Sequence, residues 1–260
     1  GDYSTNEPTM DGTASLIYLL AAEQSEARKP GYTLEHGAYT RSDSTKKEIS
    51  LVFTADEFFE GLPSIRGTLM KEKVPGSFFF TGRMYRNEKA IPFIRSLKND
   101  LHYLGAHSDQ HLLYADWSER DSTLVSRDSV LRDLQACHAS MEALGITDGK
   151  RLYIPPYEWW NRQVADWCHA DGVQLINFTG GTRSNADYTY PEMGRQYVSS
   201  GTIMRHLKEM EAKGALNGAV LLIHAGTDPR RKDKLYQHLP ELIRDLRRKG
   251  YAFKRVDQVF

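Results

Sequence analysis

From residue 49 onward, short apolar runs alternate with longer segments in which apolar side chains recur every three or four positions. The first pattern is typical of buried strands, and the second is typical of amphipathic helices. The predicted strands cover residues 49–54, 76–82, 103–106, 152–154, 173–178, 219–223 and 251–256. The predicted helices cover residues 60–72, 88–99, 126–144, 161–171, 200–213 and 235–249.

Strands that alternate with helices form parallel sheets with right-handed crossovers. The chain offers about seven strand–helix repeats, which is more than a compact open sheet needs and close to a (β/α) barrel. We therefore predict an α/β fold, an irregular (β/α) barrel of about seven parallel strands, built by residues 48–260.

Residues 1–47 differ from the rest because Ser, Thr, Gly and charged residues dominate them. They hold one short helix candidate at 13–28 and a strand with a turn at 37–45, so we predict a small N-terminal appendage beside the barrel. No run of about 18 apolar residues is present, and we expect no membrane span. The chain begins with Gly1 and without Met, as expected of a trimmed chain that has lost a leader.

Composition narrows the range of partners. The 34 basic and 34 acidic side chains give a formal net charge of zero, so the basic excess that a nucleic-acid partner needs is missing. Cys137 and Cys168 form no C-x-x-C pair, which argues against a cysteine zinc site. The 14 Tyr, 10 Phe and 4 Trp suit a sugar-binding cleft, although aromatic side chains also fill cores.

Four chemically active side chains stand just after predicted strands, at Asp56, His107, Tyr157 and His224. Parallel strands gather their carboxyl ends at one edge of a sheet or barrel, and that edge carries the chemistry in α/β proteins. We therefore expect these four residues to share a site.

His107 and His111 stand four residues apart and share one face if the segment turns helically. Neutral imidazoles at that spacing chelate zinc or a similar first-row metal. Such a pair also arises by chance in surface loops, but its place after a strand favours a metal site. Asp56 and Glu57 can supply a carboxylate ligand, a general base or both; the alternative is a pair of solvated loop acids.

Two prolines stiffen the loop that follows strand 152–154. A rigid loop can aim the backbone N–H of Tyr157 at a developing oxyanion, and Trp159 and Trp160 beside it can stack on a sugar ring. Ordinary packing is the alternative interpretation of this loop.

His224 ends the most apolar strand and can serve as a general acid, because an imidazole titrates near neutral pH. A buried structural histidine is the alternative. Arg183 and Asp187 are weaker candidates for orienting a catalytic group.

In their order along the chain, these motifs resemble those of the polysaccharide deacetylases, the NodB-homology domains of carbohydrate esterase family four. That family carries T-F-D-D, H-[ST]-x-x-H, R-P-P-Y and L-x-H segments. Their counterparts here are Thr54-Ala55-Asp56-Glu57, His107-Ser108-Asp109-Gln110-His111, Ile154-Pro155-Pro156-Tyr157 and Leu222-Ile223-His224. Segment 76–82 also looks like the family's second-strand A-T-F-F-x-x-G, and the resemblance covers residues 48–260.

The resemblance implies a divalent metal, often zinc, held by one carboxylate and two histidines, here Asp56, His107 and His111. A carboxylate, Asp56 or Glu57, would act as base and His224 as acid, with the Tyr157 N–H at the oxyanion. Metal binding can lower the pKa of a water to about 7, which makes hydroxide available at neutral pH.

The implied activity is hydrolysis of N- or O-acetyl groups on a polysaccharide or oligosaccharide. The candidate substrate-binding residues are Tyr157, Trp159, Trp160 and Arg183. We expect an acetylated glycan as substrate and a secreted or periplasmic location. A place in a larger modular carbohydrate-active protein is compatible with the extra N-terminal segment.

Three departures from the family pattern bear on the site. If T-A-D-E is laid on T-F-D-D, the ligand falls on Glu57 and the base on Asp56. If Phe53 is aligned with the family Phe, Thr54 and Ala55 replace both acids, and Asp56 could reach the metal by a local bulge; Asp56 is then either base or ligand. The Arg that precedes P-P-Y is Ile154, and Glu158-Trp159-Trp160 replaces the usual Gly.

Two other functions compete with an active deacetylase. A catalytically degenerate domain that only binds carbohydrate is favoured by the lost Arg and the uncertain base. A glycoside hydrolase that uses Asp56 and Glu57 is disfavoured, because adjacent acids on one loop usually point apart while glycosidase carboxylates face each other across about 5–10 Å.

Overall fold

The computed structural model describes residues 30–147 and 149–260; the helix candidate at 13–28 lies outside this part of the chain. The strands are β1 (Thr33–Glu35), β2 (Ala38–Arg41), β3 (Glu48–Ala55), β4 (Ser77–Phe80), β5 (Tyr103–Ala106), β6 (Leu152–Tyr153), β7 (Gln174–Leu175), β8 (Ala219–His224) and β9 (Ala252–Phe253). The α-helices are α2 (Leu62–Glu72), α3 (Gly82–Tyr85), α4 (Ile91–Asn99), α5 (Arg127–Glu142), α6 (Arg162–Ala170), α7 (Ser200–Ala212), α8 (Leu239–Arg248) and α9 (Val256–Val259). Short 3-10 helices are η1 (Pro156–Glu158), η2 (Ser184–Tyr188), η3 (Pro191–Gln196) and η4 (Leu235–His238).

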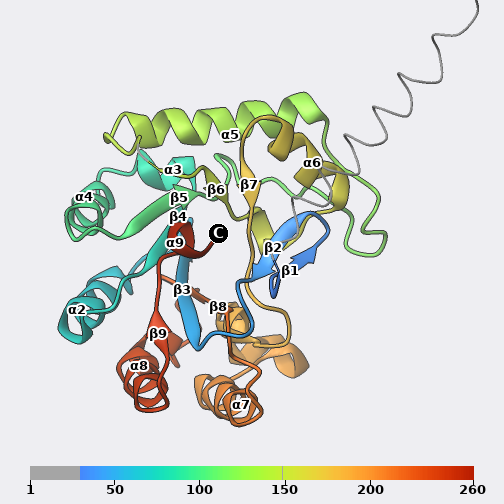
Figure 1. The fold of residues 1–260 in the computed structure, drawn as a ribbon. Coiled ribbons are helices and arrows are strands. Elements are labelled where there is room, and N and C mark those ends of the chain that lie inside the picture. The colour runs from blue at the N-terminus through green and yellow to red at the C-terminus, as the bar shows by residue number, and fades with distance from the viewer. Residues whose placement is uncertain (1–29, 148) are drawn as a thin grey trace, which may run out of the picture.

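Within the described residues the strands form one curled sheet in the order β1-β2-β8-β3-β4-β5-β6-β7, with β9 paired to β3. Every pairing among β3 to β9 is parallel. Helices α2, α4, α5, α7 and α8 lie around the outside of this sheet (Figure 1). The predicted α/β fold, an irregular barrel of about seven parallel strands, is confirmed.

An antiparallel hairpin from before residue 48 completes the curl. Strand β1 pairs with β2, and β2 pairs with β8 through Arg41 and Ala219. On its other side β2 touches the end of β7, where Tyr39 bridges Ile176 and the Asn177 N–H donates to the Tyr39 carbonyl at 2.9 Å. The boundary predicted at 47/48 therefore divides one continuous sheet.

The apolar side chains separate into two layers because neighbouring strand residues point to opposite faces. Side chains facing the inside of the curl include Val52, Phe79 and Leu222, and they form one buried cluster. Those facing outward, such as Leu51 and Phe53, pack in a larger cluster with the helices. Helix α9 caps the amino-terminal end of the curl, where the Val256 N–H donates to Ser77 Oγ at the start of β4.

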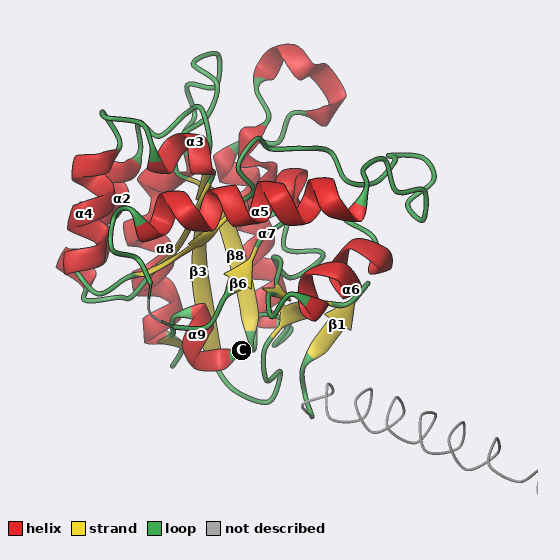
Figure 2. Ribbon diagram, turned by 90° about the horizontal axis from the view of Figure 1, so that it is seen from above, coloured by secondary structure: helices red, strands yellow, loops and turns green. Residues whose placement is uncertain are grey.

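Helices begin where the sequence supplies a suitable residue. Helices α2, α4 and α8 have Pro in their first turn, where the missing N–H costs little. Ser126, Asn161 and Ser199 cap α5, α6 and α7 through side-chain oxygens. Pro in the first turn of α8 also explains why the predicted helix 235–249 is divided into η4 and α8. No helix in the described ranges is long and apolar enough to cross a membrane, and the view from above shows the helices packed along the strands (Figure 2).

Candidate active site

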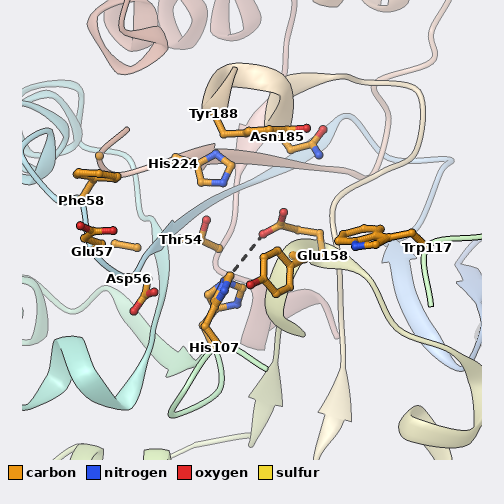
Figure 3. A pocket seen from close by; sticks show the side chains of 14 residues that line it. Thr54, Asp56, Glu57, Phe58, His107, Trp117, Glu158, Asn185, Tyr188 and His224 are labelled. Carbon is orange, nitrogen blue, oxygen red and sulfur yellow. Dashed lines mark ion pairs between the residues drawn. The ribbon is translucent and has the colours of Figure 1, made fainter. Parts of the chain in front are cut away.

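A cavity of about 490 Å³ opens at the carboxyl end of the strands. Six of the residues singled out in the sequence line it: Asp56, Glu57, His107, His111, Tyr157 and His224. The loops after β3, β5 and β6 and the last residue of β8 supply them, as the placement at strand ends predicts. Trp159, Trp160 and Arg183 are not among the lining residues. Figure 3 shows the side chains converging on the cavity from several strands.

His107 is held in a defined tautomer. Its ring is 3% exposed, and Nδ1 lies 2.8 Å from the carbonyl oxygen of Ile154. A carbonyl only accepts, so Nδ1 carries the proton and Nε2 presents a lone pair. Burial, together with the neighbouring His111 ring, lowers the pKa of His107 well below its usual value. The ring is therefore neutral near pH 7 and is suited to bind a cation.

His111 reaches the same place through a tight loop and not through a helical turn. Ser108 and His111 both have left-handed backbones, with φ of 68° and 57°. The two imidazole centroids lie 5.0 Å apart. Burial lowers the pKa of His111 too, so both rings are available as neutral donors.

The carboxylate of Asp133 on α5 holds this loop. It accepts from Ser108 Oγ at 2.5 Å, from the Asp109 N–H at 2.8 Å and from the Gln110 N–H at 2.9 Å. These bonds replace the regular helical bonds that the loop lacks, and they fix the separation of the two histidines.

We expect Asp133→Ala to lower the free energy of unfolding by about 2–4 kcal/mol, because it leaves buried donors without an acceptor. The change should also weaken binding of Zn²⁺ by the histidine pair. Chemical denaturation and zinc titration measure the two effects. Glu142→Ala, an exposed acid on the same helix, is the control and should leave both unchanged.

Strand β3 ends at the cavity without carboxylates. Its pairing with β4 and β8 runs without a register shift through Thr54, and with β4 as far as Ala55. The ladder therefore contains no bulge as far as Ala55, and Asp56 follows it as a residue that lines the cavity. The Asp56 carboxylate accepts from Thr81 Oγ1 at 2.8 Å and forms an ion pair with Arg83. The hydroxyl of Thr54 is buried and has no hydrogen-bond partner among the described residues.

His224 forms a pair with Asp187 of η2. His224 Nδ1 lies 2.6 Å from Asp187 Oδ1, and the His224 backbone N–H donates to Oδ2 at 3.0 Å. Burial by itself lowers the pKa of His224, but the charge and hydrogen bond of Asp187, with a contribution from Glu158, raise it to about 9. The imidazole is therefore protonated at neutral pH and can donate a proton.

The loop after β6 has an unusual backbone. Tyr157 and Glu158 are consecutive left-handed residues, with φ of 59° and 52°. This conformation costs a residue with a Cβ roughly 1–2 kcal/mol. The Tyr157 N–H has no protein acceptor within the described ranges.

Glu158 lies opposite the histidines. Its side chain is 9% exposed, and Oε1 is 3.9 Å from Nε2 of His107 (Figure 3, dashed line). Burial raises the pKa of the Glu158 carboxyl, while protonated His224 opposes that shift.

Exposed aromatic rings surround the mouth of the cavity. Trp117, Tyr157 and Tyr188 are 57%, 46% and 49% exposed. Trp117 stacks on Trp159 with centroids 5.6 Å apart, so Trp159 supports the rim from behind. Trp160 is buried, with its indole N–H donating to the His36 carbonyl.

The site fits a metal in part. His107 and His111 supply two neutral imidazoles, and an orphaned hydroxyl lies at the cavity floor. No three His, Cys, Asp or Glu side chains stand in a ligand arrangement within residues 30–147 and 149–260. The described residues therefore supply two imidazole donors and no third protein ligand in place beside them.

Four residues of the site are not predicted by the sequence motifs. Glu158 enters the motif comparison only as a replacement for Gly, and Trp117, Asp133 and Tyr188 belong to none of the motifs. A non-glycine residue directly after P-P-Y is the one signal that could have directed attention to Glu158.

A family profile and a relative of known name both relate this chain to the polysaccharide deacetylases. The profile of the polysaccharide deacetylase family matches residues 41–176, slightly more than half of the chain. Over 219 residues the chain is 26% identical to the peptidoglycan-N-acetylmuramic acid deacetylase PdaA of Bacillus subtilis, covering 82% of this chain and 72% of PdaA.

Solved structures share the fold. Bacillus subtilis PdaA, a family 4 carbohydrate esterase, superposes with a TM-score of 0.65 at 21% identity, covering 86% of this chain and 85% of PdaA. BA3943, a CE4 family pseudoenzyme from Bacillus anthracis, superposes with a TM-score of 0.66 at 20% identity. The match covers 87% of this chain and 69% of the BA3943 chain. Both an enzyme and a pseudoenzyme are thus similar to this chain.

Proposed function

Since the chain belongs to the polysaccharide deacetylase family, we propose that it is a metal-dependent hydrolase that removes N- or O-acetyl groups from a glycan. One observation carries the proposal: His224, which is paired with the buried Asp187, lines the same cavity as the two neutral histidines. A proton donor and a cation site in one cavity are what acetyl transfer to water requires.

Each group has a definite task in this proposal. A divalent metal, zinc in the first instance, would polarise the acetyl carbonyl and the attacking water when held at His107 and His111. The Tyr157 N–H donates to the carbonyl oxygen as negative charge develops there. Protonated His224, oriented by Asp187, gives its proton to the departing sugar nitrogen or oxygen.

The rim supports a sugar substrate. Exposed aromatic faces at Trp117, Tyr157 and Tyr188 provide apolar platforms on which pyranose rings can lie. The name of PdaA refers to an N-acetylated peptidoglycan sugar, so we include peptidoglycan among the candidate substrates. We place the reaction on glycans outside the cytoplasm.

Acetate release tests the proposal. The full chain is incubated with N-acetylated chitooligosaccharides, peptidoglycan and O-acetylated xylan, with zinc, after chelation and after zinc is returned. We expect acetate from at least one substrate, its loss on chelation and its recovery with zinc. Release that chelation leaves unchanged would contradict the metal dependence.

A degenerate, carbohydrate-binding domain is the second candidate. Thr54 and Ala55 stand at the end of β3, Ile154 replaces the motif Arg, and a structural relative is a pseudoenzyme. Binding of these glycans without acetate release under any metal condition would favour this function.

A further inference from the structure

Arg231, in the loop between β8 and η4, is a buried cation. Its side chain is 0% exposed, and its ion-pair partner Asp233 lies 3.8 Å away, beyond hydrogen-bond distance. The Nε atom of Arg231 has no hydrogen-bond partner within residues 30–147 and 149–260. Burial of a charge with an incomplete set of partners is unfavourable. Stability of the fold therefore gives little reason for a charged side chain at this position.

The guanidinium of Arg231 joins its own loop to the end of η2 and to the start of α7. Nη1 donates to the carbonyl of Thr189 at 2.5 Å and to that of Val198 at 3.0 Å, and Nη2 donates to Ser200 Oγ at 3.0 Å. Thr189 directly follows η2, and Ser200 is the first residue of α7. A planar guanidinium presents its donors in a rigid fork. It can therefore hold these three acceptors in one arrangement.

The two elements that Arg231 joins carry the two halves of the proton-donating pair. His224 is the last residue of β8, and Asp187 lies in η2, shortly before Thr189. The contact between His224 Nδ1 and Asp187 Oδ1, at 2.6 Å, and the bond from Arg231 to Thr189 together close a ring of contacts between the loop after β8 and η2. Figure 3 shows Tyr188, the neighbour of Asp187 in η2, beside His224. A change in the contact of Arg231 with Thr189 should therefore reach the pair.

The loop from His224 to Arg231 has other supports of its own. The Thr227 N–H donates to Glu60 Oε1 at 3.2 Å, and Lys234 Nζ donates to the Thr227 carbonyl at 2.9 Å. A Cβ on Gly226 would lie 2.3 Å from backbone atoms of the loop after β3, so this backbone is closely packed. Loss of the Arg231 bonds should therefore displace the end of η2 and leave the loop in place.

We infer that Arg231 is a positioning residue for the reaction: by holding the end of η2 against the loop after β8, it keeps the Asp187 carboxylate on His224. Arg231 is not among the residues that line the cavity, so it acts through the pair and not on the substrate. The inference rests on the proposed function only for the task of the proton, because the state of the pair can be measured without substrate.

Arg231 can act on the pKa of His224 in two ways that have opposite signs. Burial lowers this pKa, Asp187 and Glu158 raise it, and the positive charge of Arg231 lowers it by less than Asp187 raises it. Removal of the charge alone would raise the pKa, whereas displacement of Asp187 would lower it. The other titratable groups on this side of the cavity are His107 and His111, both neutral near pH 7, and Tyr188, whose ring centroid is 6.0 Å from that of His224.

Titration of His224 by NMR in the metal-free, full-length chain tests the assignment. We expect Arg231→Met, which removes both fork and charge, to lower the pKa of His224 from about 9 by more than about one unit, because the contact with Asp187 is lost. Arg231→Lys keeps the charge without the fork and should lower the pKa as well. Arg230→Met is the matched control, since this exposed neighbour pairs with Asp228, and it should leave the pKa unchanged.

Kinetics provide a second readout. In Arg231→Met, kcat for acetate release should fall by about 10–100-fold, a part of the contribution of a general acid. KM should change by less than about threefold, because no group that binds the substrate is altered. Arg230→Met should have the kcat of the wild-type chain.

Two results overturn the assignment. A pKa of His224 that rises in Arg231→Met would show that Arg231 acts through its charge alone. A pKa that is the same as in the wild-type chain in both Arg231 variants, however far the thermal unfolding midpoint falls, would make Arg231 a structural residue. If Arg231→Met is unfolded by circular dichroism, Arg231→Lys decides by the same criterion. A lowered pKa in a chain that releases no acetate under any metal condition would support Arg231 as the residue that holds the pair and would overturn only the proposed function.

Discussion

Replacing His224 by Gln should reduce acetate release by about 10²–10⁴-fold, the usual contribution of a positioned general acid. In the wild-type chain the buried Asp187 carboxylate accepts hydrogen bonds from the His224 ring and from the His224 backbone N–H. The Gln amide can still donate to this carboxylate in place of the ring. The fold and the metal content should therefore be preserved. Turnover, bound zinc and the thermal unfolding midpoint are measured on the same preparations.

His169→Gln is the matched control, since this histidine is exposed on α6 and is not among the residues that line the cavity. Unchanged turnover in His224→Gln would show that the ring is structural. Loss of zinc in His224→Gln would make His224 a ligand.

Replacing Asp187 by Asn should lower the pKa of His224. In the metal-free chain, Asp187 holds the pKa of His224 at about 9 against the opposing effect of burial. Without its charge, that pKa should fall toward or below the ordinary 6.5. Histidine titration by NMR measures the shift directly.

The same pair links stability to pH. The folded-state pKa of His224 lies above the unfolded value, so its stabilisation is fully present below about pH 6.5 and is lost as pH rises through about 9. A difference of this size corresponds to on the order of 3 kcal/mol. The wild-type chain should have a larger free energy of unfolding in urea than the Asp187→Asn variant. This difference should become smaller as the pH rises from about 6.5 to about 9. A gap that is constant from pH 6 to pH 10 would show that His224 is neutral in the folded chain.

Local patterns predicted most of the fold. The apolar runs at 103–106 and 219–223 match β5 and β8 almost residue for residue. Each run is short, continuous and flanked by polar residues or glycine, which is typical of a buried strand. The place of β2 in the sheet could not be predicted, because its pairing with β8 joins residues far apart in sequence and leaves no periodic signal. The final predicted strand at 251–256 was too long, because the chain turns into α9 after β9.

The site was predictable where a residue type and a strand end coincide. His107, His111, Tyr157 and His224 line one cavity for that reason. The orientation of Asp56 depends on Thr81 and Arg83, residues outside its own motif. The left-handed backbone of Glu158 likewise depends on the packing of its loop. Sequence spacing carries no information about either.

Strand β2 has a consequence for the order of events during synthesis. The Ser42 hydroxyl bonds to the carbonyl of Gly218, 176 residues later, beside the β2–β8 pairing. At 5–20 residues per second, β2 waits roughly 10–35 s on the ribosome before β8 exists. During that interval one edge of β2 has no partner, and unpaired edges invite pairing between chains. Because synthesis runs from the N-terminus, the first strands of this sheet are among the last to complete their pairing. Slower translation lengthens the period in which nascent chains can associate.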